Sequence, residues 1–180
     1  MPTHAGSCRD LPAHETAALR ASLMRRLGTY LVWILLSELA GVLGALATAP
    51  AIPTWYAALA KPAWTPPGWL FGPVWTALYA LMGIAAARIW IRYRQTPAGK
   101  RSLALFGAQL ALNAEWPVLF FGLKAPGAAL FAILILWATI VALIVWWWRL
   151  ERISALLLVP YLAWVSFATA LNAAIWRLNP

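Results

Sequence analysis

The chain has 180 residues, of which 63% are hydrophobic and 11% are charged, and its formal net charge is +9. A domain of this size leaves much of its surface facing solvent, so this composition excludes a water-soluble globular fold and requires lipid as the solvent for much of the chain. The sequence also lacks the strand-like alternation of apolar and polar residues that is typical of membrane β-barrels. We therefore expect an all-α membrane protein.

The N-terminal segment, residues 1–26, is expected to form a flexible tail. It contains both histidines and the single cysteine, Cys8, and shows no apolar periodicity. Two arginines followed by an apolar run resemble a signal peptide, but the polar segment before the run is long and Glu38 interrupts the run. We therefore expect no cleavage and a transmembrane domain over residues 27–180.

Five apolar runs follow the tail, and each is long enough to cross the hydrocarbon core of a bilayer, which is about 30 Å thick. The later runs are joined by short connections, which predicts a five-helix bundle whose consecutive helices are antiparallel neighbours. The predicted helices are Thr29–Thr48, Trp69–Ile91, Leu103–Leu123, Gly127–Trp148 and Ile153–Trp176.

The connection between the first two predicted helices, residues 49–68, is much longer than the later connections. Its prolines prevent a continuous helix, although residues 54–60 can form about two turns behind an N-cap at Thr54. A connection of this length is usually functional, and we expect it to cap a ligand pocket. The alternative is an interfacial aromatic belt, because tryptophan favours the headgroup region, but a belt does not explain Lys61 among prolines and rings.

The distribution of basic residues predicts the orientation. With these five helices, one face of the membrane carries 11 of the 14 basic residues, and the other face carries Lys61, Lys124 and Arg177. The positive-inside rule then places the N-terminus inside and the C-terminus outside. The long connection lies on the outer face in this arrangement.

Few polar side chains interrupt the predicted helices. Glu38 and Glu115 are the acidic residues within them, and the cost of a carboxylate in the membrane makes each a functional candidate. Gln109, Asn113 and Asn172 serve either as hydrogen-bonding glue between helices or as ligand contacts. We favour the structural role for these three amides.

The absence of certain residue types and motifs from the sequence excludes several kinds of chemistry. No histidine lies beyond residue 14 and no cysteine beyond Cys8, which rules out a transmembrane metal cluster of ordinary ligand type and an axial histidine for haem. The sequence has no Ser–His–Asp set and no glycine-rich phosphate loop, which argues against hydrolases and nucleotide-driven pumps. What remains is a cavity of rings and small residues, which suits a flat hydrophobic ligand.

The second and fifth predicted helices supply the candidate walls of this cavity. Phe71, Trp75 and Tyr79 share one helix face at four-residue spacing, and Trp164 has a small residue one turn beyond it. A planar macrocycle can stack on such rings, with its carboxylates at Lys61 near the outer rim. Ordinary helix packing is the simpler explanation of the ring stripe when only these residues are considered.

Four longer segments of the chain follow one another in a characteristic order. They are WYAALAKPAWTPP (55–67), GPVWTALY (72–79), QLALNAEWPVLFFG (109–122) and PYLAWVSFATALN (160–172). Together they resemble the TspO/MBR family, which comprises the bacterial tryptophan-rich sensory proteins and the mitochondrial translocator protein, also known as the peripheral-type benzodiazepine receptor. The resemblance covers residues 30–179.

This resemblance implies a five-helix bundle, commonly a homodimer, whose first loop caps a pocket for porphyrins, sterols and synthetic benzodiazepine-type ligands. It implies binding of tetrapyrroles such as protoporphyrin IX by a sensor, scavenger or carrier that requires no cofactor and contacts membrane lipid but no nucleic acid. Light- and oxygen-dependent degradation of porphyrins is the alternative, with Trp75 and Trp164 as its candidate catalytic residues. By position, the implied pocket residues are Trp55, Lys61, Phe71, Trp75, Tyr79, Asn113, Trp116, Trp164 and Ala168.

The chain departs from the family pattern at two places. The sterol motif near the end of the fifth helix needs a tyrosine, and none occurs between Leu171 and Arg177. Sterol recognition by that route is therefore in doubt. Glu115 stands where an uncharged residue is more usual.

Overall fold

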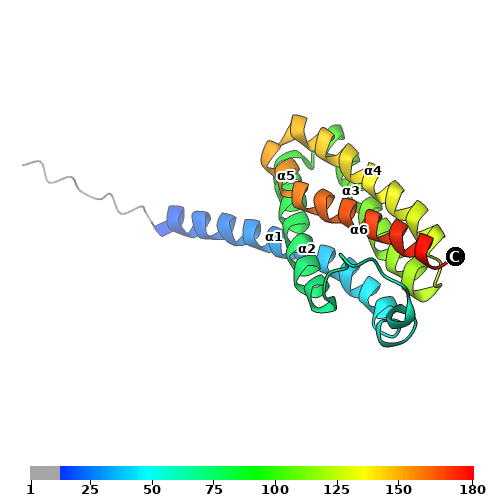
Figure 1. Ribbon diagram of the computed structural model, residues 1–180. Coiled ribbons are helices and arrows are strands. Elements are labelled where there is room, and N and C mark those ends of the chain that lie inside the picture. The colour runs from blue at the N-terminus through cyan, green and yellow to red at the C-terminus, as the bar shows by residue number, and fades with distance from the viewer. Residues whose placement is uncertain (1–12) are drawn as a thin grey trace, which may run out of the picture.

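A computed structural model describes residues 13–180, which form a bundle of helices (Figure 1). Five stretches of these residues are long and apolar enough to cross a membrane, as the sequence predicts. No strand is assigned within residues 13–180, which confirms the predicted all-α class. The helices are α1 (Ala13–Thr48), α2 (Gly68–Tyr93), α3 (Pro97–Pro117), α4 (Pro126–Leu150), α5 (Arg152–Leu157) and α6 (Val159–Leu178).

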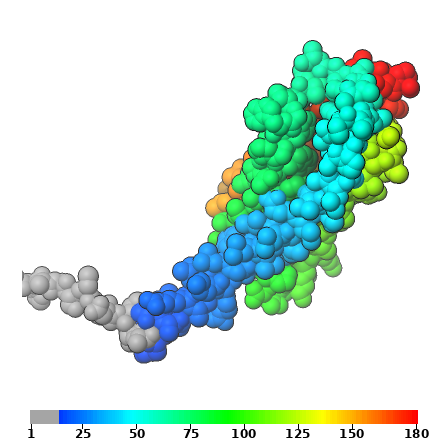
Figure 2. Space-filling view, turned by 90° about the horizontal axis from the view of Figure 1, so that it is seen from below, coloured from blue at the N-terminus to red at the C-terminus, as the bar shows by residue number. Residues whose placement is uncertain are grey.

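The first helix begins earlier than predicted. It is helical from Ala13, so residues 13–26 do not form the expected flexible tail, while residues 1–12 lie outside the described part of the chain. The reason is local, because alanine, leucine, arginine and glutamate favour helix and dominate this stretch. With 36 residues, α1 is about 54 Å long, and its N-terminal end projects from the bundle (Figures 1 and 2).

Prolines divide two of the predicted helices. After Pro117, α3 gives way to a π-helical turn, η2 (Val118–Gly122). The fifth predicted helix is split into α5 and α6 because Pro160 has no N–H to donate to the carbonyl of Leu156. Both breaks fall in segments that the apolar pattern treats as continuous.

The helices close into a ring around the core. α1 packs against α2 and α3, α3 packs against α4, α4 packs against α6, and α2 completes the ring by contacting α5 and α6. Met82, Phe106, Ile140 and Trp147 are fully buried in the half of the bundle remote from the first loop. The core of this half is therefore filled by large side chains.

Glu151, at the corner between α4 and α5, anchors that densely packed half. Its Oε1 accepts hydrogen bonds from Nη2 of Arg88 and Nη1 of Arg92, each at 2.8 Å. Its Oε2 accepts from Nε of Arg88 at 3.1 Å and from the backbone N and Oγ of Ser154 at 2.7 and 2.6 Å. The Arg88 guanidinium, with help from Ser154, lowers the pKa of Glu151 to about 2. This cluster joins α2 to the α4–α5 corner.

Candidate functional site

A cavity of about 590 Å³ lies between the helices beneath the connection from α1 to α2. Its walls come from α1, α2, α3, α4 and α6, and the connection contributes Tyr56, Lys61, Thr65 and Pro66 to its lining. This volume is in the range of pockets that enclose a small organic ligand. Residues of the long connection therefore form part of the cavity wall.

The connection begins with a π-helical turn, η1 (Ile52–Tyr56), which differs from the predicted helix over residues 54–60. The N-cap is Ala51, and Pro53 occupies the first turn, where its missing N–H costs nothing. The predicted N-cap at Thr54 is wrong, because its hydroxyl donates to the carbonyl of Pro50 at 3.0 Å. The turn starts earlier because proline favours the first helical position.

Lys61 holds the end of this turn. Its Nζ donates to the carbonyls of Tyr56, Ala57 and Leu59 at 2.7, 3.2 and 2.9 Å, and it lies 4.9 Å from the centroid of the Tyr56 ring. An ammonium group has three hydrogens, so all three are engaged by the connection itself. A ligand carboxylate at this position has to displace one of these carbonyls.

The far end of the chain fastens the connection to the bundle. The side chain of Asn179 accepts a hydrogen bond from the backbone N–H of Ala60 at 3.0 Å and donates to its carbonyl at 2.9 Å. The ring of Trp64 packs edge-on against Phe167 of α6, with centroids 5.7 Å apart. The cover of the cavity is thus held at two points by the C-terminal helix and the residue that follows it.

Aromatic rings from α2 and α6 form the main wall. Trp75 stacks on Tyr79 with centroids 5.4 Å apart and planes at 27°, which confirms the predicted shared face. Trp164 meets Phe71 edge to face at 5.7 Å. The indole Nε1 of Trp164 is buried and has no hydrogen-bond partner among the described residues. These rings give the cavity a π-rich surface with an unused donor.

A chain of hydrogen bonds runs behind the rings. The hydroxyl of Tyr79 donates to Oδ1 of Asn113 at 2.5 Å, and Nδ2 of Asn113 donates to the hydroxyl of Tyr161 at 2.8 Å. Tyr161 in turn donates to Oε1 of Gln109 at 2.9 Å. This chain links α2, α3 and α6, so the predicted structural role of Asn113 and Gln109 is confirmed.

Asn172 makes a second bridge between helices. Its Oδ1 accepts from the indole N–H of Trp116 at 3.1 Å, and its Nδ2 donates to the carbonyl of Pro126 at 2.8 Å. The structural role expected for Asn172 is therefore also observed. Both Asn113 and Asn172 line the cavity as well as bridging helices.

The structure brings most of the predicted pocket residues together. Trp55 is the exception, because its ring packs against Phe120 at 5.7 Å and Phe120, rather than Trp55, faces the cavity. The predicted residues that line the cavity are Lys61, Phe71, Trp75, Tyr79, Asn113, Trp116, Trp164 and Ala168.

The two acidic candidates have different surroundings. Glu38 lines the cavity from α1, whereas Glu115 is exposed on α3 and is not part of the cavity wall. Sequence reasoning did not place Gly41, Ile133 or Leu136 in the wall. A glycine within an apolar run was the available signal for Gly41, because a Cβ there would overlap the ring of Tyr79. The two α4 residues carry no signal in a uniformly apolar helix.

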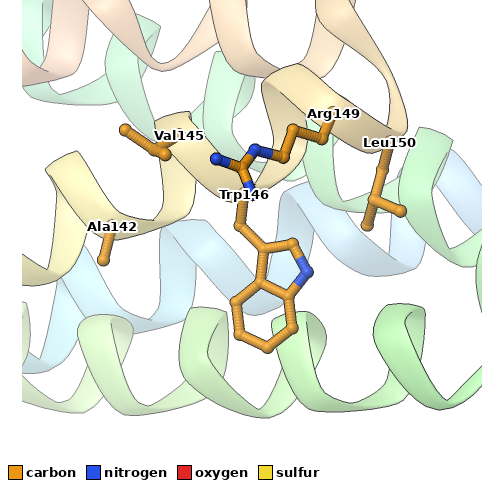
Figure 3. A pocket seen from close by; sticks show the side chains of 5 residues that line it. All are labelled: Ala142, Val145, Trp146, Arg149 and Leu150. Carbon is orange, nitrogen blue, oxygen red and sulfur yellow. The ribbon is translucent and has the colours of Figure 1, made fainter.

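A second hollow, of about 610 Å³, lies along one side of α4 (Figure 3). Ala142, Val145, Trp146, Arg149 and Leu150 line it, and all five belong to the same helix. A wall made by one helix cannot surround a ligand, and its single ring, Trp146, does not match the several rings and amides of the cavity beneath the connection. We therefore assign the functional site to the cavity beneath the connection.

Comparisons with known proteins point to one family. Residues 33–177 match the TspO/MBR family. The chain is 38% identical over 151 residues to protein CrtK of Rhodobacter capsulatus, covering 84% of this chain and 92% of that protein. It is 45% identical over 139 residues to the tryptophan-rich protein TspO of Archaeoglobus fulgidus, covering 77% and 89%. It is 43% identical over 126 residues to the human translocator protein, covering 69% and 75%.

Proposed function

Because the chain belongs to the TspO/MBR family, we propose that its cavity binds porphyrins or other tetrapyrroles and that the protein acts as their sensor, scavenger or carrier in the membrane. The observation that carries the proposal is the ring-lined cavity of about 590 Å³ under a fastened cover. The faces of a tetrapyrrole are π surfaces, which pack well against indole and phenol rings.

In the proposed pose the macrocycle stacks on Trp75 and Trp164, with its propionates toward the connection at Lys61. The two tryptophans support this pose because they line the cavity from different helices, α2 and α6. Ala168, one turn beyond Trp164, also lines the cavity, and its small side chain leaves room for the ligand.

Titration of the purified protein in detergent with protoporphyrin IX tests the proposal, with tryptophan fluorescence followed in the dark. We expect saturable quenching, and we expect Trp75→Ala and Trp164→Ala to weaken binding at least about tenfold, or about 1.4 kcal/mol. Trp148→Ala is the matched control, because Trp148 is 47% exposed and lies away from the cavity. Unchanged affinity in both cavity variants removes this pose, and an absence of saturable quenching removes the proposed ligand.

The alternative is an enzyme that degrades porphyrins with light and oxygen. Its supporting observation is the presence of Trp75 and Trp164 in the cavity wall, where an indole can donate an electron to a bound, photoexcited ligand. Illumination of the same samples separates the two functions. A stable porphyrin spectrum favours a binder, and protein-dependent new absorbing species that disappear with Trp75→Ala or Trp164→Ala favour the enzyme.

The orientation that we propose places the N-terminus inside. Its support is that ten of the 13 basic residues within residues 13–180 lie at one end of the helices. In a Cys8→Ser background, an impermeant maleimide should label Ser22→Cys only from the inner side and Leu123→Cys only from the outer side, since both positions are exposed. The reverse pattern contradicts the proposal.

We further propose a homodimer formed through α3. Its support is an exposed stripe of small side chains, where a Cβ on Gly107 would meet no other atom within 4 Å. Such stripes allow close helix contact in membranes. Gly107→Leu should reduce cross-linking of the protein in vesicles, and undiminished cross-linking contradicts this interface. The stripe consists of Ala104, Gly107, Ala108 and Ala111.

A further inference from the structure

Glu38 is a carboxylate within a membrane-spanning helix, and it lines the cavity. Within residues 13–180 it makes no hydrogen bond and no ion pair, since both salt bridges in that range belong to Glu151. A carboxylate at membrane depth is costly, and such residues usually pair with another group or face a functional cavity. The protein therefore keeps an unpaired acid at its ligand site.

Tyr79, which faces this part of α1, does not supply a partner for Glu38. Glu38 and Gly41 are three residues apart and thus lie on the same face of α1, and Gly41 packs directly against the ring of Tyr79. The one hydroxyl hydrogen of Tyr79 is donated to Asn113, and the Asn113 side chain in turn donates to Tyr161. These hydrogen bonds leave the Tyr79 hydroxyl without a hydrogen for the carboxylate.

The basic side chain of the cavity is also committed elsewhere. Lys61 donates its three hydrogens to backbone carbonyls of the connection. Its charge is thus used to hold the cover, while the carboxyl group of Glu38 lines the cavity. Apart from the buried indole N–H of Trp164, the unpaired polar group that the described residues offer to a ligand is therefore the carboxyl group of Glu38, which can accept hydrogen bonds and pair with a cation.

From these observations we propose that the cavity selects a flat hydrophobic ligand that carries a protonated nitrogen or an N–H donor, and that Glu38 binds this group. The inference rests on the proposed function, because it assumes that the cavity holds a flat ligand. It adds the chemical class of that ligand, and metal-free tetrapyrroles with their pyrrole N–H groups belong to this class. A cationic group beside Glu38 compensates the acid in a medium of low dielectric, a neutral ring leaves it unpaired, and an anionic group at that position, unlike one at the connection, is repelled.

Three acridines of nearly equal shape test the selection: 9-aminoacridine, which is a cation at neutral pH, acridine, which is neutral, and acridine-9-carboxylate, which is an anion. Binding to the full chain in detergent is measured by calorimetry. We expect the cation to bind at least about tenfold more tightly than acridine, equivalent to about 1.4 kcal/mol, and the anion to bind most weakly.

The substitution Glu38→Gln should remove this preference, so that the variant binds the cation and acridine with affinities that agree within about twofold, since the amide keeps the shape and loses the charge. The matched control is Glu115→Gln, because Glu115 is exposed on α3 outside the cavity and its loss should leave the preference intact. Saturable binding of acridine by Glu38→Gln shows that the variant is folded.

Two results overturn the inference: an equal affinity of the unmodified protein for the cation and the neutral ring, or a preference that survives in Glu38→Gln. The first result is obtained with the unmodified protein alone, so the inference can be refuted even when the Glu38→Gln variant does not fold. Protoporphyrin IX distinguishes this failure from a failure of the proposed function. A protein that binds protoporphyrin IX without preferring the cation contradicts only the role of Glu38, and the opposite result contradicts only the tetrapyrrole.

Discussion

Tyr79 and Asn113 are joined by a hydrogen bond of 2.5 Å that ties α2 to α3 at the cavity wall. The second amide atom of Asn113 is engaged by Tyr161 of α6, so the amide is held from two sides. Three helices therefore meet through one side chain, and the protein's own hydrogen bonds hold this part of the wall together.

Substitutions in this series of hydrogen bonds should lower the free energy of unfolding by different amounts. Tyr161→Phe removes two hydrogen bonds and leaves the side chain of Gln109, whose Nε2 has no partner among the described residues, without any bond. Tyr79→Phe removes one bond. With about 0.6 kcal/mol for a hydrogen bond between membrane helices, we expect roughly 1–2 kcal/mol for Tyr161→Phe and about half of that for Tyr79→Phe. Thermal unfolding in detergent measures both, and equal losses contradict the network.

Gly83 should tolerate no side chain. A Cβ there would lie 2.7 Å from the backbone N of Ile34 and 2.8 Å from the carbonyl O of Trp33, and backbone cannot move aside as a flexible side chain can. Gly83→Ala should therefore lower the unfolding temperature by several degrees through separation of α1 from α2. Gly72→Ala in the same helix is the control, because no atom lies within 4 Å of its Cβ position. We expect that variant to be neutral or stabilised by helix propensity.

Glu151 should make the fold sensitive to acid. Its pKa is lowered in the folded protein to about 2, so its contribution is fully present above its ordinary value of 4.5 and is lost as the pH falls toward 2. The contribution is on the order of 3 kcal/mol, since one pKa unit is worth about 1.4 kcal/mol. Unfolding temperatures of the unmodified protein and Glu151→Gln should differ at pH 6 and converge in this acidic range. A constant difference between the unmodified protein and Glu151→Gln across this pH range contradicts the assignment.

Lys61 should act on ligands through the connection that it holds. Because its three hydrogens are bound to backbone carbonyls, Lys61→Met should loosen the cover and weaken protoporphyrin IX and its dimethyl ester to a similar degree, by roughly tenfold or 1.4 kcal/mol. The ester lacks the carboxylates, so the comparison isolates charge pairing. A loss confined to the free acid shows instead that Lys61 binds the propionates.

The membrane-spanning helices could be predicted from the sequence because the thickness of the bilayer sets the length of each apolar run. A membrane-spanning helix needs about 20 apolar residues, and this requirement located all five spans to within a few residues of their observed ends, except at the starts of α1 and α3. Residues 13–26 were missed because the apolar pattern stops at Arg26, whereas local helix propensity continues to Ala13. The break at Pro160 was missed because apolarity continues through it.

The cavity was predictable only where rings recur at helical spacing. The four-residue spacing of Trp75 and Tyr79 predicts a common helix face, and their rings stack in the structure. α4 is apolar on every side, so its pattern could not show that Ile133 and Leu136 face the cavity. The partners of Lys61 depend on how the proline-rich connection folds back on itself, and no spacing rule for helices or strands describes that.

α1 is one continuous helix, so the part of it that forms the cavity wall and the part that projects from the bundle move together when the helix tilts. The same rigid helix that carries Glu38 and Gly41 runs back to Ala13, about 38 Å away along its axis. For a straight rod of that length, a tilt of about 5° at the wall displaces the projecting end by about 3 Å. A change in the contents of the cavity that tilts α1 is thus transmitted, mechanically and without any rearrangement of the loops, to a surface beyond the bundle.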